Sequence, residues 1–313
     1  MLHPSENSYH GRTSINREYW HERIRLSNIN ALDKIEAGKK PALLGFCSDT
    51  GVQRNQGRIG AKNGPDAIRQ ALGPLAYHAR FDYIQDFGNC WDYDGNLEEG
   101  HDELYGHIHS LLAHNYFPVI FGGGHDLAYP HGKAVMDYCL AKNDKVGIIN
   151  LDAHLDLRDL ANGQRHSGSP FFQLAEAYGK DFHYCCLGMQ PASNPKSLLT
   201  YAEKINACIV DSSDFQQENW QGIQDQLEHF CADKNKLYLS IDLDGFSSAY
   251  APGVSAPSPL GFSPILAMKI IDWLMASKKM SAMDIVELNP LFDQDNCTAK
   301  LAARLVEYTI RKM

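Results

Sequence analysis

The sequence predicts an α/β fold in which one mainly parallel sheet lies between two layers of helices. Short apolar runs alternate along the 313 residues with segments whose apolar side chains recur at helical spacing. Alternating strands and helices are typical of a parallel sheet that is covered on both faces. No linker-like stretch, fixed-period repeat or low-complexity tract interrupts this pattern. We therefore expect a single three-layer α/β/α domain spanning residues 1–313.

Eight apolar runs are expected to form the buried strands of this sheet. They span residues 41–47, 83–87, 117–122, 145–152, 182–188, 206–211, 236–244 and 282–288. Helices are expected between them, most clearly over residues 96–114 and 263–276, where apolar side chains recur at helical spacing. Residues 1–40 are polar apart from the pair Tyr19 and Trp20. We expect them to be a peripheral N-terminal segment, with an outer helix that follows a loose terminus.

The composition is that of an acidic globular protein. Hydrophobic residues make up 44% of the chain, and 29 Lys and Arg face 38 Asp and Glu, so the formal net charge is -9. This leaves no basic field for nucleic acid or an anionic membrane. No run approaches the roughly 20 apolar residues of a membrane span, and the start has no signal-like apolar run. The eight cysteines form no C-x-x-C pair, which predicts reduced packing residues in a cytoplasmic protein.

Polar residues are concentrated where three of the predicted strands end. These ends read FGGGHD (121–126), LDAHLD (151–156) and SIDLDGF (240–246). Ligands of open α/β sheets bind at the carboxyl ends of strands, and alternate residues of an extended segment face the same way. The three glycines would let the backbone turn sharply into the site. The residues expected to converge are His125, Asp152, His154, Asp156, Asp242 and Asp244.

Such a cluster calls for a metal. Four carboxylates in one pocket cannot all stay ionised without positive compensation, because like charges repel and burial adds to the cost. One or two dications would supply that charge. Six oxygen and nitrogen ligands without sulfur exceed what a zinc site takes, and they suit a harder ion such as Mn²⁺ at a two-metal centre. The alternative is that Asp152 and Asp242 cap helices while His125 and His154 are hydrogen-bonded core residues.

Other chemistry finds little support in the sequence. His107 and His109 are two residues apart on a predicted helix and point to nearly opposite sides, so they are not expected to chelate a metal together. The chain has neither G-x-x-x-x-G-K-[ST] nor G-x-G-x-x-G, which disfavours nucleotide binding. It also lacks G-x-S-x-G, which disfavours a serine hydrolase. A small-molecule substrate at a metal centre remains as the main prediction.

GGGHD, DAHLD and SIDLD, in this order and with these gaps, resemble the metal motifs of the arginase, agmatinase and formimidoylglutamase (ureohydrolase) family. The resemblance extends from residues 51–72 to residues 285–295. It implies an arginase-like fold with an eight-stranded, mainly parallel sheet, two Mn²⁺ ions per chain and a homo-oligomer. The ligands it implies are His125, Asp152, Asp156 and Asp242 for one ion, and Asp152, His154, Asp242 and Asp244 for the other. Asp152 and Asp242 would bridge the two ions.

Within this family the sequence is similar to the formimidoylglutamase branch. The similar segments are RNQGRIGA (54–61), DLR (156–158), HSGSPF (166–171) and DLDGFSSAYAPGVSAPS (242–258). Members that act on guanidines usually carry Asp-Pro and then P-G-T-G-T-P, where this chain has Ser247, Ser248 and APGVSAP. The implied reaction is hydrolysis of N-formimidoyl-L-glutamate to L-glutamate and formamide in histidine degradation. An agmatinase, an arginase-type guanidine hydrolase and a non-catalytic metal-binding protein are the alternatives.

The resemblance also implies roles for residues around the metals. Asp156 would relay the proton of the attacking water, and His166 matches a proton-shuttle histidine, with a hydrogen-bonded loop residue as the alternative. Glu287 matches the residue that holds the cationic amidine, with a turn cap as the alternative. The carboxylates of the substrate need cations of their own, for which Arg158 is the first candidate and a solvated arginine the alternative. Weaker candidates are Arg54, Arg58 and Arg165.

Overall fold

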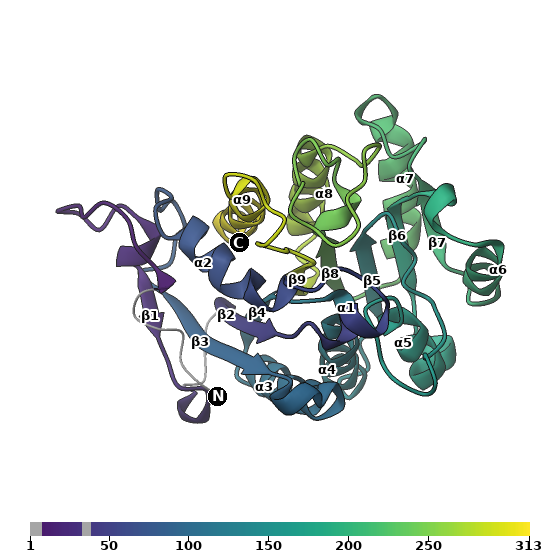
Figure 1. Ribbon diagram of the computed structural model, residues 1–313, viewed down its shortest axis with the longest axis horizontal. Coiled ribbons are helices and arrows are strands. Elements are labelled where there is room, and N and C mark those ends of the chain that lie inside the picture. Colours follow the sequence, from purple (N-terminus) through teal and green to yellow (C-terminus); the bar gives the residue numbers. More distant parts are fainter. Residues whose placement is uncertain (1–7, 33–38) are drawn as a thin grey trace.

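The computed structural model describes residues 8–32 and 39–313, in which nine strands form one sheet (Figure 1). The strands are β1 (Ile24–Leu26), β2 (Lys40–Cys47), β3 (Ile84–Trp91), β4 (Tyr116–Phe121), β5 (Val146–Leu151), β6 (Tyr184–Met189), β7 (Cys208–Asp211), β8 (Lys236–Asp242) and β9 (Met280–Val286). All neighbouring strands pair in parallel. Each of the eight predicted runs overlaps one of the strands β2 to β9.

The sheet has one strand more than predicted, because β1 is too short to show a strand pattern. It holds three residues and pairs with β3 through Ile24 and Ile84. The expected outer helix is wrong for residues 8–32, which hold 3-10 turns at Trp20–Glu22 and Ile29–Ala31 but no α-helix. The side chain of Trp20 is fully buried and anchors this segment to the core. The expectation of a loose terminus falls on residues 1–7, outside the described residues.

Nine α-helices accompany these strands in the described part of the chain. They are α1 (Thr50–Arg54), α2 (Gly64–Leu72), α3 (Leu97–Ala113), α4 (Ala128–Leu140), α5 (Pro170–Tyr178), α6 (Lys196–Lys204), α7 (Trp220–Cys231), α8 (Pro264–Ala276) and α9 (Cys297–Lys312). Two of them, α3 and α8, were expected from the helical spacing of their apolar side chains, and both begin at a capping residue. Ser263 caps α8, with Pro264 at its first position. Asn96 caps α3 by accepting the backbone N–H of Glu99.

The helices cover both faces of the sheet, which gives the predicted three layers (Figure 1). α2, α7, α8 and α9 pack their apolar side chains on one face, and α3, α4 and α5 pack theirs on the other. The central strands are therefore buried on both sides. This double burial explains why their sequences read as continuous apolar runs instead of alternating ones.

The strand order places four strand ends together at the centre of the sheet. The order is β1-β3-β2-β4-β9-β8-β5-β6-β7, so β4, β9, β8 and β5 are adjacent. Because they are parallel, their carboxyl ends lie along the same edge.

Among the helices of the described ranges, none is long and apolar enough to cross a membrane.

Candidate metal centre

The predicted site residues follow these four central strands. His125 lies just beyond β4, and Asp152 comes directly after β5. Asp242 is the last residue of β8, and Glu287 comes directly after β9. The structure thus brings the three predicted strand ends together, and it inserts β9 between β4 and β8. Because these strands are neighbours in the sheet, residues as far apart in sequence as His125 and Glu287 lie side by side.

A first group of side chains converges on Nδ1 of His125. This atom lies 2.9 Å from carboxylate oxygens of both Asp156 and Asp242. Asp152 Oδ2 is 3.4 Å away. His125 Nδ1 is buried, yet no described residue meets it with hydrogen-bond geometry. The ring and the three carboxylates therefore point toward a common position, as the ligands of a shared cation do.

A second group consists of Asp152, His154 and Asp244. His154 Nδ1 lies 3.4 Å from Asp152 Oδ1 and 3.3 Å from Asp244 Oδ1. Asp244 Oδ1 is buried without a hydrogen-bond partner among the described residues. Asp152 presents one oxygen to each group, which is the position of a bridging carboxylate. Asp242 joins only the first group, and its Oδ1 accepts the backbone N–H of Asp244.

The electrostatics of the two groups show a shortage of positive charge. Burial lowers the pKa of His125, but Asp152, Asp156 and Asp242 outweigh this effect and raise it well above its ordinary value. The pKa of Asp242 is also well above its ordinary value, because burial and the nearby charges of Asp244 and Asp152 all raise it. Both shifts mean that the site holds protons tightly, because protons are its available counter-charge. The oxygen- and nitrogen-rich donor set and the unpartnered buried atoms fit a pair of hard divalent cations.

A buried polar chain fixes the other ring nitrogen of His125. Nε2 lies 2.9 Å from Ser240 Oγ, and that hydroxyl donates to Asp284 at 2.6 Å. Asp284 also accepts from His131 Nδ1 at 2.7 Å and from the hydroxyl of Tyr238. Because the Ser240 proton is committed to Asp284, His125 Nε2 must be the donor to Ser240. Nε2 therefore keeps its proton, and Nδ1 is the nitrogen whose lone pair becomes available when a cation replaces the proton held among the carboxylates.

Glu287 ties the end of β9 to the turn after β4. Its Oε1 accepts the backbone N–H of His125 at 2.8 Å, and its own backbone N–H donates to the Gly123 carbonyl at 2.9 Å. Glu287 has a φ of 65°, a left-handed conformation that costs energy for a residue other than glycine. Burial and Asp244 raise its pKa to about 8. The carboxylate therefore braces the turn while Glu287 also lines the cavity.

The glycines before His125 serve close packing. The backbone bends at residues 123 and 124, as expected, and it does so without a positive φ at any of residues 122–124. A Cβ on Gly123 would lie 2.2 Å from the carbonyl oxygen of Ser48. Glycine is required here because the backbone of the turn runs directly against the segment after β2.

A cavity of about 300 Å³ opens over the two groups. This is the size of a small-molecule site, since such sites typically measure about 300–1,000 Å³. The candidate residues that line it are His154, Asp156, Asp242, Asp244, Glu287 and Arg158. Residues 55–58, 193–194 and 255–256, together with Ser167 and Leu198, complete the wall. The cavity thus joins the carboxylate cluster to a positively charged rim.

Arg158 lies on this wall without an acidic partner among the described residues. Its side chain is exposed, and Nη1 donates to Asn55 Oδ1 at 3.3 Å. Asn55 Nδ2 in turn donates to Ser167 Oγ at 3.0 Å. The guanidinium is therefore oriented by neutral groups, and its charge is left free to meet an anion in the cavity.

The weaker arginine candidates have other partners. Arg58 also lines the cavity, but its guanidinium donates to the carbonyl oxygens of residues 254 and 255. Arg54 pairs with Glu98 at 2.7 Å. Neither Arg54 nor Arg165 lines the cavity.

His166 does not reach the cavity in this structure. The residue is 3% exposed, and it is not among those that line the wall. Its Nδ1 accepts the backbone N–H of Gly168 at 3.2 Å, so Nε2 carries the proton and donates to the Asp159 carbonyl at 2.9 Å. Both ring nitrogens therefore hold the loop between α5 and the second metal motif.

Asn194 is a site-shaping residue that sequence reasoning missed. Its Nδ2 donates to the carbonyls of Ala153 and Gln190, and its Oδ1 accepts the backbone N–H of Leu155. These bonds hold the segment that carries His154 and Asp156. Asn194 lies in a loop with no hydrophobic periodicity, so a single sequence holds no signal for it. The Ser240 and Asp284 chain did leave a signal, namely polar residues inside strands predicted to be buried on both faces.

Comparisons with known proteins agree with this geometry. A family model described as the arginase family matches residues 39–311. The chain belongs to the arginase family. Among curated relatives in this family, a formimidoylglutamase of Clostridium tetani is 36% identical over 315 residues, which cover 96% of this chain and 93% of that protein. A formimidoylglutamase of Vibrio cholerae is 42% identical over 275 residues, covering 84% of this chain and 81% of that protein.

Solved structures place the chain in the same arginase-family fold. Formimidoylglutamase from Bacillus subtilis has a TM-score of 0.85 at 22% identity and covers 97% of this chain and 94% of its own. A crystal structure of Trypanosoma cruzi formiminoglutamase with Mn²⁺₂ has a TM-score of 0.78 at 28% identity, covering 91% of this chain and 98% of its own. The predicted α/β fold is therefore confirmed, apart from its ninth strand.

Proposed function

We propose that this arginase-family chain is a binuclear manganese hydrolase, a formimidoylglutamase that cleaves N-formimidoyl-L-glutamate to L-glutamate and formamide in histidine degradation. The observation that carries this proposal is the convergence of four aspartates and two histidines beneath a cavity with an unpaired arginine. The curated formimidoylglutamases that are 36% and 42% identical to the chain support the substrate assignment.

Two Mn²⁺ ions per chain are proposed as the cofactor. The first would be held by His125, Asp152, Asp156 and Asp242, and the second by Asp152, His154, Asp242 and Asp244. When bound, such ions supply the positive charge that activates water at neutral pH and stabilises charge developing in the transition state. The protein contributes the fixed donor geometry, including the His125 tautomer selected by Ser240.

Two acidic residues would carry the proton and substrate chemistry. The amidine of the substrate is cationic at neutral pH. Glu287 lies at the cavity wall, and bound cations would offset the Asp244 charge that helps to raise its pKa, so that its carboxylate would accept the amidine N–H groups. Asp156 is 12% exposed at its side chain and faces the cavity. We assign it the transfer of the attacking water's proton to the glutamate nitrogen, which must be protonated before it can leave.

Substrate selection is assigned to Arg158. An unpaired guanidinium at the cavity wall suits bidentate binding of a glutamate carboxylate. His166 receives a structural role, because both of its ring nitrogens are engaged by its own loop. The shuttle role expected from sequence would require the ring to leave both of these partners.

An assay of three substrates tests the proposal. Purified, Mn²⁺-loaded protein should hydrolyse formimidoylglutamate far faster than agmatine, which has no carboxylate for Arg158, and far faster than arginine, which has one carboxylate where formimidoylglutamate has two. Efficient turnover of agmatine or arginine would favour the guanidine-hydrolase alternative. No turnover of any of the three by protein that holds two ions would favour the non-catalytic alternative.

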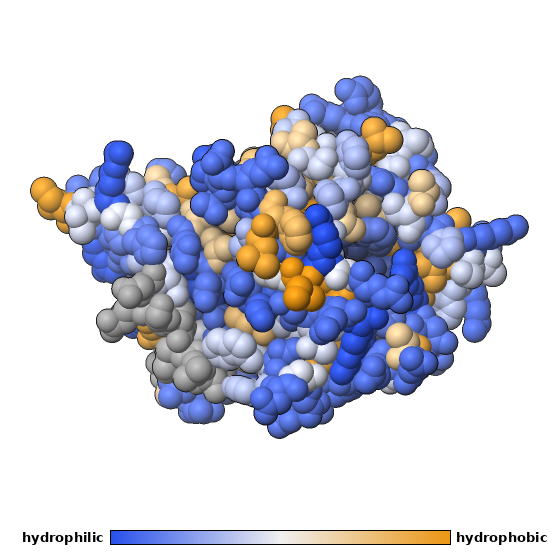
Figure 2. Space-filling view, viewed as in Figure 1, coloured by the Kyte–Doolittle hydropathy of each residue, from blue (hydrophilic) through white to orange (hydrophobic). Residues whose placement is uncertain are grey.

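The remaining features are proposed on sequence and surface grounds. We infer one domain over residues 1–313, with residues 1–40 peripheral, and a cytoplasmic protein whose eight cysteines are free thiols. A homo-oligomer is supported by exposed apolar side chains, among them Ile59 and Leu291. Figure 2 shows a largely hydrophilic face with apolar residues gathered near its middle.

The net charge of -9 speaks against a nucleic-acid partner.

A further inference from the structure

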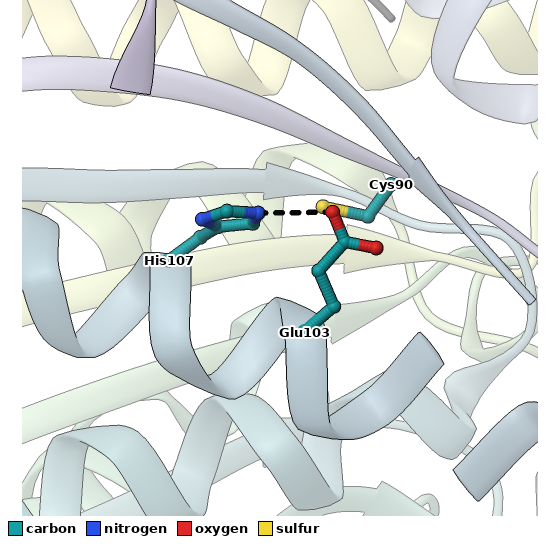
Figure 3. Close-up of side chains that lie close together, drawn as sticks. All are labelled: Cys90, Glu103 and His107. Carbon is teal, nitrogen blue, oxygen red and sulfur yellow. Dashed lines mark hydrogen bonds and ion pairs between the residues drawn. The ribbon is translucent and has the colours of Figure 1, made fainter. Parts of the chain in front are cut away.

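A second kind of ligand cluster lies outside the candidate metal centre. It consists of Cys90 on β3 with Glu103 and His107 on α3, whose ligand atoms all lie within 4.8 Å of one another (Figure 3). Cys90 is fully buried beneath the helix. The side chains of Glu103 and His107 are 28% and 20% exposed. None of the three lines the cavity of the proposed active site.

The fold dictates how these three side chains meet. Glu103 and His107 are four residues apart on α3, which makes them neighbours on one helix face. His107 Nε2 lies 3.1 Å from Glu103 Oε1, the contact drawn in Figure 3. The sulfur of Cys90 approaches the same point from strand β3, on the opposite side from the helix. The cluster therefore has a buried sulfur on one side and a partly exposed ring nitrogen and carboxylate on the other.

The chemistry of this trio differs from that of the carboxylate centre. Thiolate, imidazole and carboxylate together are the ligands of zinc sites, and three protein ligands leave a fourth position for water. Sulfur favours zinc-like, thiophilic ions over the harder Mn²⁺. The simpler alternative is a helical His–Glu pair above a packing cysteine, and in that case the sulfur would take no part in binding.

We propose that Cys90, Glu103 and His107 form a site for a thiophilic divalent cation of the Zn²⁺ class. Binding forms metal bonds to Sγ, to a ring nitrogen and to a carboxylate oxygen, and it releases the thiol proton to solvent. Such an ion would tie α3 to β3 on the face of the sheet that packs against α3 and α4. The site is independent of the proposed hydrolase activity, because no ligand is shared.

Cobalt provides a probe that reports sulfur ligation directly. The full-length protein would be loaded with Mn²⁺, kept in excess Mn²⁺ and titrated with Co²⁺, while the sulfur-to-cobalt charge-transfer absorption is followed. The carboxylate centre has no sulfur among its proposed ligands, so it does not contribute to this band. We expect the wild type to saturate at about one Co²⁺ per chain, as one such trio predicts, and Zn²⁺ to displace it.

Matched variants decide the assignment. Cys90→Ser should abolish the band, whereas Cys139→Ser, which alters another buried cysteine of the same core layer, should leave it unchanged. His107→Gln should weaken Co²⁺ binding by at least the roughly 10–100-fold that even an outer-shell partner is worth to a metal site. His109→Gln, on the same helix, should leave Co²⁺ binding unchanged. The proposal is overturned if the wild type shows no band or if Cys90→Ser keeps it. Should Cys90→Ser fail to fold, undiminished binding by the folded His107→Gln variant would overturn it equally.

Discussion

Removing the guanidinium of Arg158 is the sharpest test of the substrate assignment. Arg158 lines the cavity, is oriented by Asn55 and is not among the candidate metal ligands. Arg158→Ala should therefore weaken binding of a glutamate carboxylate without emptying the metal centre. The loss should fall on KM, because the contact exists in the bound substrate and in the transition state alike, and kcat should change little.

The expected size of the effect follows from the kind of bond that is lost. A hydrogen bond to a charged group contributes about 1.5–3 kcal/mol. Since each 1.4 kcal/mol is a factor of ten, that range corresponds to a change in KM of roughly 10–150-fold. The Arg158 side chain is exposed, and water screens its charge. We therefore expect the low end, a KM about tenfold higher. The KM of Arg158→Lys should lie between those of the wild type and Arg158→Ala, because lysine keeps the charge but loses the planar guanidinium.

Substrate analogues show whether the loss comes from a carboxylate. Steady-state release of formamide would be measured with formimidoyl-glutamate and with its two amides, formimidoyl-glutamine and formimidoyl-isoglutamine. If Arg158 binds one carboxylate, the penalty of Arg158→Ala should shrink toward none for the amide that lacks this carboxylate and should persist for the other. Arg25→Ala is the matched control, because Arg25 is exposed on the edge strand β1 and its loss changes the net charge equally.

Three results would refute this reasoning. An unchanged KM for Arg158→Ala would mean that the guanidinium is a solvated surface group. An equal penalty for all three substrates would mean that Arg158 acts on the cavity's shape instead of on a carboxylate. A loss of manganese from Arg158→Ala would also contradict it, since the structure gives Arg158 no part in either ligand group.

Four other perturbations test the site and the core. Asp152→Asn should remove manganese and activity together in elemental analysis and turnover assays, because Asp152 faces both ligand groups; two ions retained per chain would contradict the ligand assignment. Ser240→Ala leaves a histidine ring nitrogen without its acceptor, and manganese affinity should fall roughly 10–100-fold with the fold intact by circular dichroism. Arg69→Met strands the buried carboxylate of Asp86, 2.7 Å from the guanidinium, so urea unfolding should show a loss of about 3–5 kcal/mol. A thiol reagent should label chiefly the exposed Cys297 in the native protein and leave turnover intact, whereas inactivation that substrate prevents would reveal a cysteine at the site.

Much of the fold was predictable because the central strands are buried on both faces. Their apolar runs are continuous and end at polar motifs, so the eight runs and their alternation with helices could be read directly. The ninth strand could not, because β1 has three residues and is only partly buried. Its position depends on pairing with β3 and on the burial of Trp20, which are contacts between distant segments. Local patterns do not encode such contacts.

The candidate site was predictable to the extent that it lies at strand ends. The rule that parallel strands end at one edge is enough to bring His125, Asp152 and Asp242 together. It does not reveal which loops cross above that edge. Asn194 shapes the segment after β5 from a loop more than 30 residues further along the chain, and the ring of His166 is turned into its own loop. Both outcomes depend on tertiary hydrogen bonds.

Backbone strain at the site falls on residues that the sequence does not mark as strained. Asp156 and Glu287 have φ values of 48° and 65°, in the left-handed region where glycine is the usual residue. Each such conformation costs about 1–3 kcal/mol, and it persists only where the surroundings over-determine it. At Glu287 the determinants are visible, since its backbone and its carboxylate are both bonded to the turn at residues 123–125. The glycines of that turn, by contrast, have ordinary φ values and are needed for close packing. The strained positions of the site are thus occupied by acidic residues that line the cavity, and at Glu287 the conformation depends on tertiary hydrogen bonds that the local sequence does not encode.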